Sequence, residues 1–237
     1  SNHIADIIEA HFVEKIGHRE SPAEKTAWRN SMQYMERVLR NSGIQDDCGI
    51  LIEYTIPNTS LRVDFIVTGR DENQEKNYVL IELKQWETAE TTDIPELVHA
   101  FVGGGLRNVT HPSYQAGSYN RMLKLMNEGI YANDIEGKPC VYLHNYAKHD
   151  PEPLLDSRYE EGVKEAPIYF IDDYRRLQEY LKQMVGQGKG MDILYEIEHG
   201  RIRPSKALVD CVDSLYVGND EFVLVDEQVV ADRKSVV

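Results

Sequence analysis

Residues 62–86 read RVDFIVTGRDENQEKNYVLIELKQW, two arms rich in β-forming residues on either side of a polar centre. In the first arm Val63, Phe65 and Val67 alternate with their neighbours, as expected for a strand with two different faces. The second arm, Tyr78–Leu83, has the same enrichment, and the segment RDENQEKN between the arms is polar. This stretch therefore predicts a β-hairpin around which the other elements are arranged.

The predicted hairpin brings charged side chains together on one of its faces. Folded about Asn73, it places Asp64 opposite Glu82, because cross-strand partners in an antiparallel pair are equidistant from the turn. Lys84 lies two residues beyond Glu82 and so shares its face. The length of the loop does not fix the register, so a pairing shifted by one residue is the alternative.

Two carboxylates and an ammonium on one face of an apolar hairpin predict a metal site. Buried charges must be paired or must bind a metal, and the oxygen atoms of Asp64 and Glu82 suit Mg²⁺ or Mn²⁺. Lys84 would then orient or deprotonate an attacking water. The alternative is structural: Glu82 and Lys84 point to solvent, and Asp64 marks the start of a strand.

A helix is predicted before the hairpin, from residue 21 to about Arg40. SPAE at 21–24 is a capping box with proline at the first helical position. Glu24 lies one turn before Trp28, on the apolar stripe of this helix, so its carboxylate is expected to face inward. A role in capping alone is the alternative for Glu24.

Other polar residues are candidates from their positions on predicted elements. Gln115 and Tyr119 are one turn apart on a helix that begins after Pro112, so they project from one face. Glu53, in the first predicted strand, is a second acidic candidate. His111 and His144 are interpreted as capping, packing or core histidines, not as metal ligands.

The segment between the hairpin and the Gln115 helix has no clear period. It shows turns, a short helix at 95–101 and a glycine run at 103–105 that suggests a flap over a cleft. The remaining strands are expected at 50–56, 138–147, 166–171 and 221–225, and the remaining helices at 3–17, at 172–184 and, in two short pieces, at 192–216.

Composition limits the class of protein. At 237 residues the chain is long enough for one core with an appended subdomain, and it contains no apolar run of membrane-spanning length. Its three cysteines are far apart and outside any CxxC pair, which favours a reducing cytoplasm. The net charge of −14 argues against simple binding of a phosphate backbone, although a bound metal ion can supply positive charge locally.

Asp64 and the later Glu82-Leu83-Lys84 resemble the D…ExK signature of the PD-(D/E)XK nucleases. The resemblance implies an α/β, restriction-endonuclease-like fold with a mixed sheet, an αβββαβ core, an N-terminal helix and a C-terminal helical extension. It also implies that Asp64, Glu82 and the main-chain carbonyl of Leu83 hold Mg²⁺ or Mn²⁺. Lys84 would orient the water and stabilise charge that grows on the phosphate during hydrolysis of DNA or RNA.

Gln115 and Tyr119 form a QxxxY that resembles the extra motif of the RecB-type branch of that superfamily. The resemblance implies that these two residues position the nucleic-acid strand near the site. In PD-(D/E)XK nucleases a glutamate from the first core helix often adds to the metal site. Glu24 is the matching candidate here, ahead of Glu53.

Longer blocks, among them PCVYLHNY at 139–146 and EFVLVDEQ at 221–228, resemble the N-terminal region of a bacterial family that joins a nuclease-like domain to a Schlafen-type DNA/RNA helicase. The glycine-rich stretch at 186–190 predicts a boundary between a domain over residues 1–185 and an extension over 186–237. The resemblance implies that the first part is nuclease-like and that a helicase acts with it in cis or in trans. The expected protein is cytoplasmic and contacts nucleic acid but no membrane. The alternative is a weak or inactive module of the same fold that binds nucleic acid or regulates a helicase.

Overall fold

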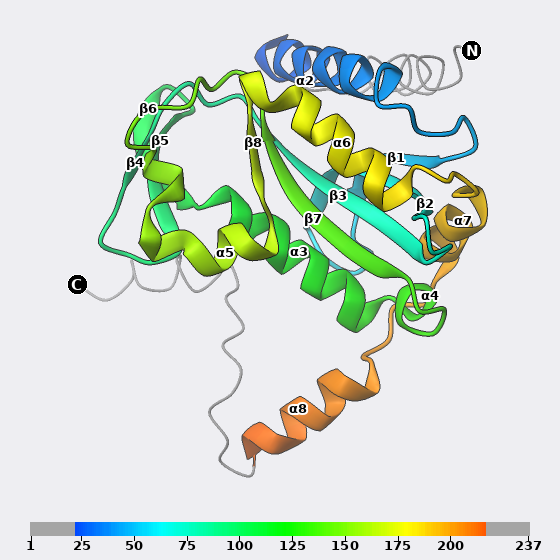
Figure 1. The fold of residues 1–237 in the computed structure, drawn as a ribbon. Coiled ribbons are helices and arrows are strands. Elements are labelled where there is room, and N and C mark those ends of the chain that lie inside the picture. Colours follow the sequence, from blue (N-terminus) through cyan, green and yellow to red (C-terminus); the bar gives the residue numbers. More distant parts are fainter. Residues whose placement is uncertain (1–21, 217–237) are drawn as a thin grey trace.

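The computed structural model describes the backbone of residues 22–216 and the side chains of residues 26–212. In this mixed α/β fold one central sheet has helices on both faces, and a smaller sheet stands to one side (Figure 1). The α/β class with a mixed sheet is therefore confirmed. The helix expected at 3–17, the serine of the capping box and the strand expected at 221–225 lie outside the described residues.

The central sheet has the strand order β1-β2-β3-β7-β8. β1 (Gly49–Thr55), β2 (Arg62–Arg70) and β3 (Lys76–Lys84) are antiparallel neighbours, and β7 (Glu136–Leu143) and β8 (Ile168–Phe170) continue the sheet in parallel. The step from β3 to the parallel β7 requires a crossover connection, and a helix lies in it. The strands expected in this part of the chain are found, with their ends shifted by a few residues.

Both faces of the central sheet are buried, which explains why its strands are almost continuously apolar. On one face, α2 (Pro22–Arg40) and α6 (Tyr174–Val185) pack against side chains that include Phe65. On the other face, α3 (Pro112–Met126) packs against side chains that include Ile66. These three helices are close to the predicted ones.

A second, antiparallel sheet lies between β3 and α3 in the chain, formed by β4 (Ala89–Thr91), β5 (Leu97–Val102) and β6 (Gly105–Thr110). The short helix predicted at 95–101 is therefore wrong. Buried and exposed side chains alternate along β5 with the period of a strand, since its second and fourth residues are buried and Phe101 is exposed.

The turn between β5 and β6 explains the glycine run. Val102 pairs with Gly105, so Gly103 and Gly104 form a two-residue turn, with φ values of 59° and 81°. Turns of this kind need positive φ at both central residues, which glycine adopts without strain. The run is thus the tip of a β-hairpin.

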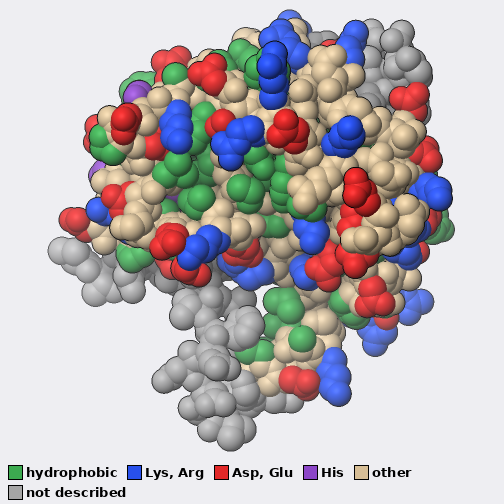
Figure 2. All heavy atoms as spheres, in the orientation of Figure 1, with side chains coloured by type: hydrophobic (Ala, Val, Ile, Leu, Met, Phe, Trp, Pro, Cys, Tyr) green, Lys and Arg blue, Asp and Glu red, His purple; other side chains and the backbone are tan. Residues whose placement is uncertain are grey.

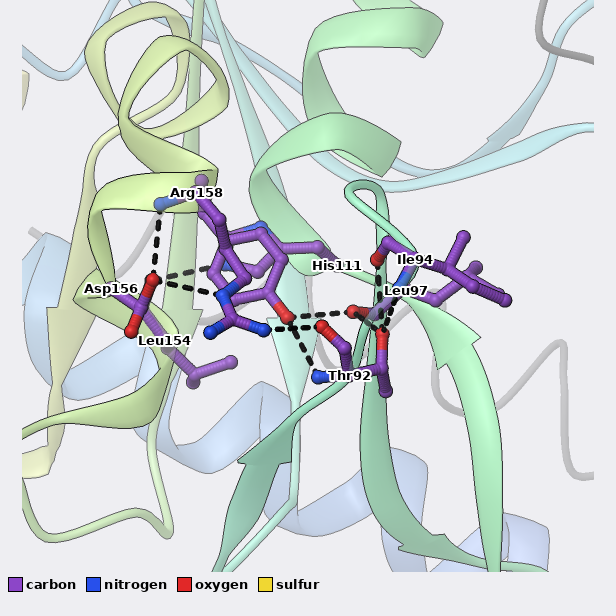
Figure 3. Close-up of polar contacts among 8 residues, drawn as sticks. Thr92, Ile94, Leu97, His111, Leu154, Asp156 and Arg158 are labelled. Atoms are coloured by element: carbon purple, nitrogen blue, oxygen red, sulfur yellow. Dashed lines mark hydrogen bonds and ion pairs between the residues drawn. The ribbon is translucent and has the colours of Figure 1, made fainter.

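Polar contacts fasten the small sheet to the body of the protein (Figure 3). The hydroxyl of Tyr159 donates to the Leu97 carbonyl (2.8 Å) and accepts from the Thr92 N–H (3.2 Å). His111 stacks on the Tyr159 ring, with 4.4 Å between ring centres, and its Nε2 lies 3.0 Å from the Leu154 carbonyl oxygen. Its Nδ1 accepts from a main-chain N–H at the start of α3, which confirms the capping role predicted for His111.

The C-terminal part of the described chain adds two short helices, α7 (Met191–His199) and α8 (Lys206–Tyr216), as predicted for residues 192–216. In the first of them Ile193 and Ile197 are fully buried in the same core as α3, so residues beyond the predicted boundary at 185 contribute to packing. The second, α8, stands away from the body (Figure 1). Within residues 22–216 none of the helices combines the length and the apolar composition that a membrane crossing requires. The remaining elements are α4 (Glu128–Tyr131), η1 (Pro153–Leu155), η2 (Ser157–Tyr159), α5 (Glu160–Glu165) and η3 (Ile171–Asp173).

Candidate active site

The predicted register of the hairpin is confirmed. Phe65 pairs with Ile81, so the next residues along the two strands, Asp64 and Glu82, are those predicted to lie opposite each other. The paired residues end at this point, and the Leu83 N–H donates instead to Oδ2 of Asp64, at 2.9 Å. A side chain thus replaces a main-chain acceptor, and β2 and β3 separate beyond it.

A cleft of about 640 Å³ lies beside the separated strand ends. Asp64 and Lys84 line it, together with the Leu83 side of the strand. One wall belongs to α2 and another to the tip of the β5–β6 hairpin, in the place where the glycine run suggested a flap. The other lining residues are Ala27, Trp28, Ser31, Met32, Glu53, Arg62, Gln85, Trp86, Phe101, Val102 and Gly103.

Four of the predicted site residues form one continuous chain of hydrogen bonds. Lys84 Nζ donates to Oε1 of Glu82 and to Oε1 of Gln115, both at 2.8 Å. The Gln115 amide in turn donates to the hydroxyl of Tyr119, at 3.1 Å. Glu82 is only 3% exposed, so this charge pair is largely removed from water. Residues from β3 and from α3, far apart in the sequence, are thereby connected.

The pKa values of Asp64 and Lys84 are both raised, but for different physical reasons. Burial raises the pKa of Asp64 above its ordinary value, and the nearby Lys84 and the Leu83 N–H only partly offset this. Burial alone would lower the pKa of Lys84, but the Glu82 and Asp64 carboxylates outweigh it and hold that pKa above its ordinary value. Lys84 is therefore a stable ammonium at neutral pH.

Glu53 interrupts the pairing of β1 with β2. Ile52 and Tyr54 on either side of it are paired, whereas Glu53 has a φ of 51°, in the left-handed region that residues with a Cβ rarely adopt. Its carboxylate lies 3.5 Å from the Arg62 guanidinium and lines the cleft. The structure thus brings this second acidic candidate to the edge of the site.

Two predicted contributions to the metal site, from Glu24 and from the Leu83 carbonyl, stay predictions. Glu24 lies in the first turn of α2, one turn before the cleft residue Trp28, but its side chain is outside the described part of the chain. Its place in a metal site stays a prediction. The same holds for the main-chain carbonyl of Leu83, although that residue lies at the cleft.

The donor atoms at the cleft are of the type that Mg²⁺ or Mn²⁺ prefers. Asp64 offers carboxylate oxygens at the cleft, and within the described residues it uses only one of its two oxygens in a hydrogen bond. The Glu82 carboxylate is not among the lining groups of the cleft and accepts from Lys84. Residues 22–216 contain no group of three or more His, Cys, Asp or Glu side chains arranged to hold a metal ion. A metal ion held by Asp64 and Glu82 therefore stays a prediction.

The aromatic wall of the cleft was not predicted. Trp28 and Trp86 are the two tryptophans of the chain, and both line the cleft, as does Phe101. Trp86 could have been found from the sequence, because it lies two residues after Lys84. In the structure its ring centre lies 5.6 Å from the Lys84 ammonium. No pattern in the sequence pointed to Phe101, because β5 was not recognised as a strand.

Gln85 and His144 tie the ends of β3 and β7 to α2. The Gln85 amide donates to the Ser31 hydroxyl at 3.0 Å, and Nε2 of His144 lies 3.0 Å from the same oxygen. His144 is buried and stacked on Tyr34, as expected for a core histidine, although its Nδ1 has no hydrogen-bond partner among the described residues. It also lines a smaller polar pocket of about 270 Å³ beside α2.

Comparison of the chain with protein-family models, with curated proteins and with solved structures finds no match. The chemistry of the cleft is therefore what points to a function.

Proposed function

We propose that the chain is a metal-dependent nuclease domain that hydrolyses phosphodiester bonds of DNA or RNA, coupled to a helicase in cis or in trans. The observation that carries the proposal is the hydrogen-bonded series from Glu82 through Lys84 and Gln115 to Tyr119, with Asp64 beside it at the cleft. These are the residues that the D…ExK and QxxxY resemblances select. They come from three separate elements and meet at one place.

The arrangement of the elements also supports the proposal. A helix, three antiparallel strands, a second helix and a strand parallel to the third follow one another as α2, β1, β2, β3, α3 and β7, with the small sheet inserted before α3. This is the order expected for the αβββαβ core of a PD-(D/E)XK nuclease.

Each residue has a role in the proposed reaction. Asp64 and Glu82 would hold Mg²⁺ or Mn²⁺, which lowers the pKa of a bound water and neutralises phosphate charge. Lys84 keeps its proton, so it orients the water and stabilises charge on the phosphate oxygens, and it does not act as the base. Gln115 is a positioning residue, because its carbonyl oxygen fixes the ammonium of Lys84.

A second function, a nuclease-fold module that binds nucleic acid or regulates a helicase without cleaving, is favoured by two observations. The chain has a net charge of −14, and its described residues contain no group of three metal-ligating side chains. Such a module would keep the hydrogen-bonded series as a structural network. Metal binding separates the two functions, because the proposed hydrolysis requires it.

The test is cleavage of end-labelled single- and double-stranded DNA and RNA in Mg²⁺, in Mn²⁺ and in EDTA. The native chain is compared with Asp64→Asn, with the pair Glu82→Gln/Lys84→Met, and with Lys124→Met as a surface control. We expect cleavage only with metal, and a loss of about 100-fold or more in the first two variants. Equal cleavage by all four proteins would overturn the assignment, and absence of both cleavage and metal binding would favour the second function.

A further inference from the structure

Three large aromatic side chains line the cleft next to the charged residues. Trp28 comes from α2, Trp86 follows the end of β3, and Phe101 comes from the β5–β6 hairpin. Phe101 is 63% exposed, which is costly for a side chain of this size. Its cross-strand partner Leu106 is 59% exposed but is not among the residues that line the cleft. Large aromatic side chains gathered at a cleft that also holds charged groups indicate a binding surface.

Positive charge is scarce at the same place. Among the described residues that line the cleft, the cationic ones are Arg62 and Lys84. Arg62 lies 3.5 Å from Glu53, and Lys84 donates to Glu82. On the face shown in Figure 2, acidic and basic side chains are interspersed. Phosphate neutralisation, which supplies most of the affinity of duplex-binding proteins, is therefore a small contribution in this cleft.

Aromatic stacking can supply the binding free energy that phosphate neutralisation does not supply in this cleft. Stacking of a base on an aromatic side chain contributes about 1–3 kcal/mol per base, as judged by alanine substitution. A base offers its face to a protein only when it is unpaired, since in a duplex both faces are covered by neighbouring base pairs. An aromatic cleft with few available cations thus selects against a duplex.

We propose that this cleft binds an unpaired stretch of DNA or RNA, with bases stacked on Phe101 and on the tryptophan walls. The inference rests on the proposed function, for which it specifies the substrate class. Phe101 acts as a stacking platform carried by the β5–β6 hairpin. Tyr159 anchors the start of β5 through the Leu97 carbonyl and the Thr92 N–H, and Phe101, four residues after Leu97, lines the same cleft as Lys84.

The two tryptophans make the test direct, because all tryptophan emission of the chain comes from the cleft. Asp64→Asn protein in EDTA, which prevents cleavage, is titrated with a 12-nucleotide oligo-dT, with oligo-U of the same length and with a blunt DNA hairpin. We expect the single strands to quench emission and to bind at least about 10-fold more tightly than the hairpin duplex. The two single strands distinguish a DNA substrate from an RNA substrate.

Phe101→Ala should weaken single-strand binding by about 5- to 160-fold, as expected for the loss of one stacked base. Leu106→Ala, which removes the exposed cross-strand partner outside the cleft, is the matched control and should change binding by less than about 2-fold. Between 50 and 200 mM salt the affinity should fall by only about 7-fold, the value for two phosphate contacts to a single strand.

Equal or tighter binding of the duplex, or equal effects of the Phe101 and Leu106 substitutions, would overturn the inference. Its failure is separable from failure of the proposed function. Tight single-strand binding by a protein that cleaves nothing in metal would support the inference and remove the nuclease assignment. Cleavage of duplex, with tryptophan emission unchanged by single strands, would do the reverse.

Discussion

A single carboxylate, that of Asp64, takes over a main-chain hydrogen bond at the point where β2 and β3 separate. The same carboxylate lines the cleft, and burial makes its ionised form unfavourable. At the scale of single residues, the candidate site is therefore assembled at a cost in stability, as is common for residues that carry chemistry. Binding of a cation would reduce that cost.

Replacing Asp64 with asparagine should stabilise the metal-free protein at neutral pH. The folded state holds the proton of Asp64 more tightly than the unfolded state, so the free energy of unfolding falls as pH rises above the ordinary pKa of 3.8. Asp64→Asn removes this loss of unfolding free energy, and the amide oxygen of the new side chain can still accept from the Leu83 N–H. Differential scanning fluorimetry should show a higher melting temperature for the variant than for the native chain at pH 7. The difference between the two proteins should be smaller at pH 4.5.

Asp46→Asn, at an exposed aspartate, is the control and should leave the melting temperature unchanged. Addition of Mg²⁺ or Mn²⁺ should raise the melting temperature of the native chain and not that of Asp64→Asn, since only a protein that binds the ligand is stabilised by it. A native chain more stable than Asp64→Asn without metal would contradict the electrostatic account of this residue.

The Glu82–Lys84 pair should show strong coupling. Lys84→Met leaves a nearly buried carboxylate without its ammonium and should cost about 3–5 kcal/mol of unfolding free energy. The double variant Glu82→Gln/Lys84→Met should recover most of this loss. Urea denaturation of the four proteins of the cycle measures the coupling.

Lys124→Met is the matched control for that cycle, because Lys124 pairs with Glu136 at the surface, where an ion pair contributes about 0–1 kcal/mol. A Lys84→Met protein as stable as Lys124→Met would show that the ammonium does not compensate Glu82.

At the scale of elements, the sequence predicted well those segments whose packing follows a single period. The hairpin register was correct because its two arms are of matched length and both faces of β2 and β3 are buried, so a slip of one residue would misplace every side chain. Gln115 and Tyr119 were placed on one face because the helical repeat alone determines it.

The small sheet was missed for an equally physical reason. β5 is six residues long, and its apolar residues fit a short helix as well as a strand. What decides in favour of a strand is tertiary: pairing with β6 and the contacts of Tyr159 and Thr92 to main-chain groups of the sheet. Neither is visible in a local pattern, so the approach of Phe101 to the cleft could not be predicted.

The hairpin turn can be tested with two neighbouring glycines. A Cβ added at Gly104 or at Gly105 would meet no atom within 4 Å, but only Gly104 has a positive φ, of 81°. Gly104→Ala should therefore cost about 1–2 kcal/mol in local stability, whereas Gly105→Ala should be nearly neutral. Faster amide hydrogen exchange at Phe101 and Leu106 in the first variant alone would confirm this; equal exchange in both would refute it.

At the scale of the whole molecule, two buried histidines join parts of the fold that are distant in sequence. His111 connects the start of α3 with the segment that anchors the small sheet, and His144 connects the end of β7 with α2. Burial lowers the pKa of each to about 4. Protonation of either histidine therefore destabilises the folded protein.

This predicts acid sensitivity. Between pH 6.5 and about 4 the unfolded chain binds protons at both histidines and the folded chain does not, so the free energy of unfolding falls as pH falls through this window. Each histidine should account for about 2 kcal/mol between pH 6.5 and 5. His144→Gln should flatten the dependence in urea unfolding, and the exposed His199→Gln serves as control; unchanged slopes in both would contradict the prediction.

The Lys84–Gln115 hydrogen bond joins the two ends of the segment that carries the small sheet, since that segment leaves β3 after Lys84 and re-enters the body just before Gln115. Residues 85–114 thus form an insert, and the two residues that flank it are held together by a hydrogen bond of the site itself. An insert of different length or sequence could be exchanged there while the acidic and basic groups stay in register. Diversification of specificity in such a scaffold would proceed by swapping this one insert, with the reaction chemistry inherited unchanged.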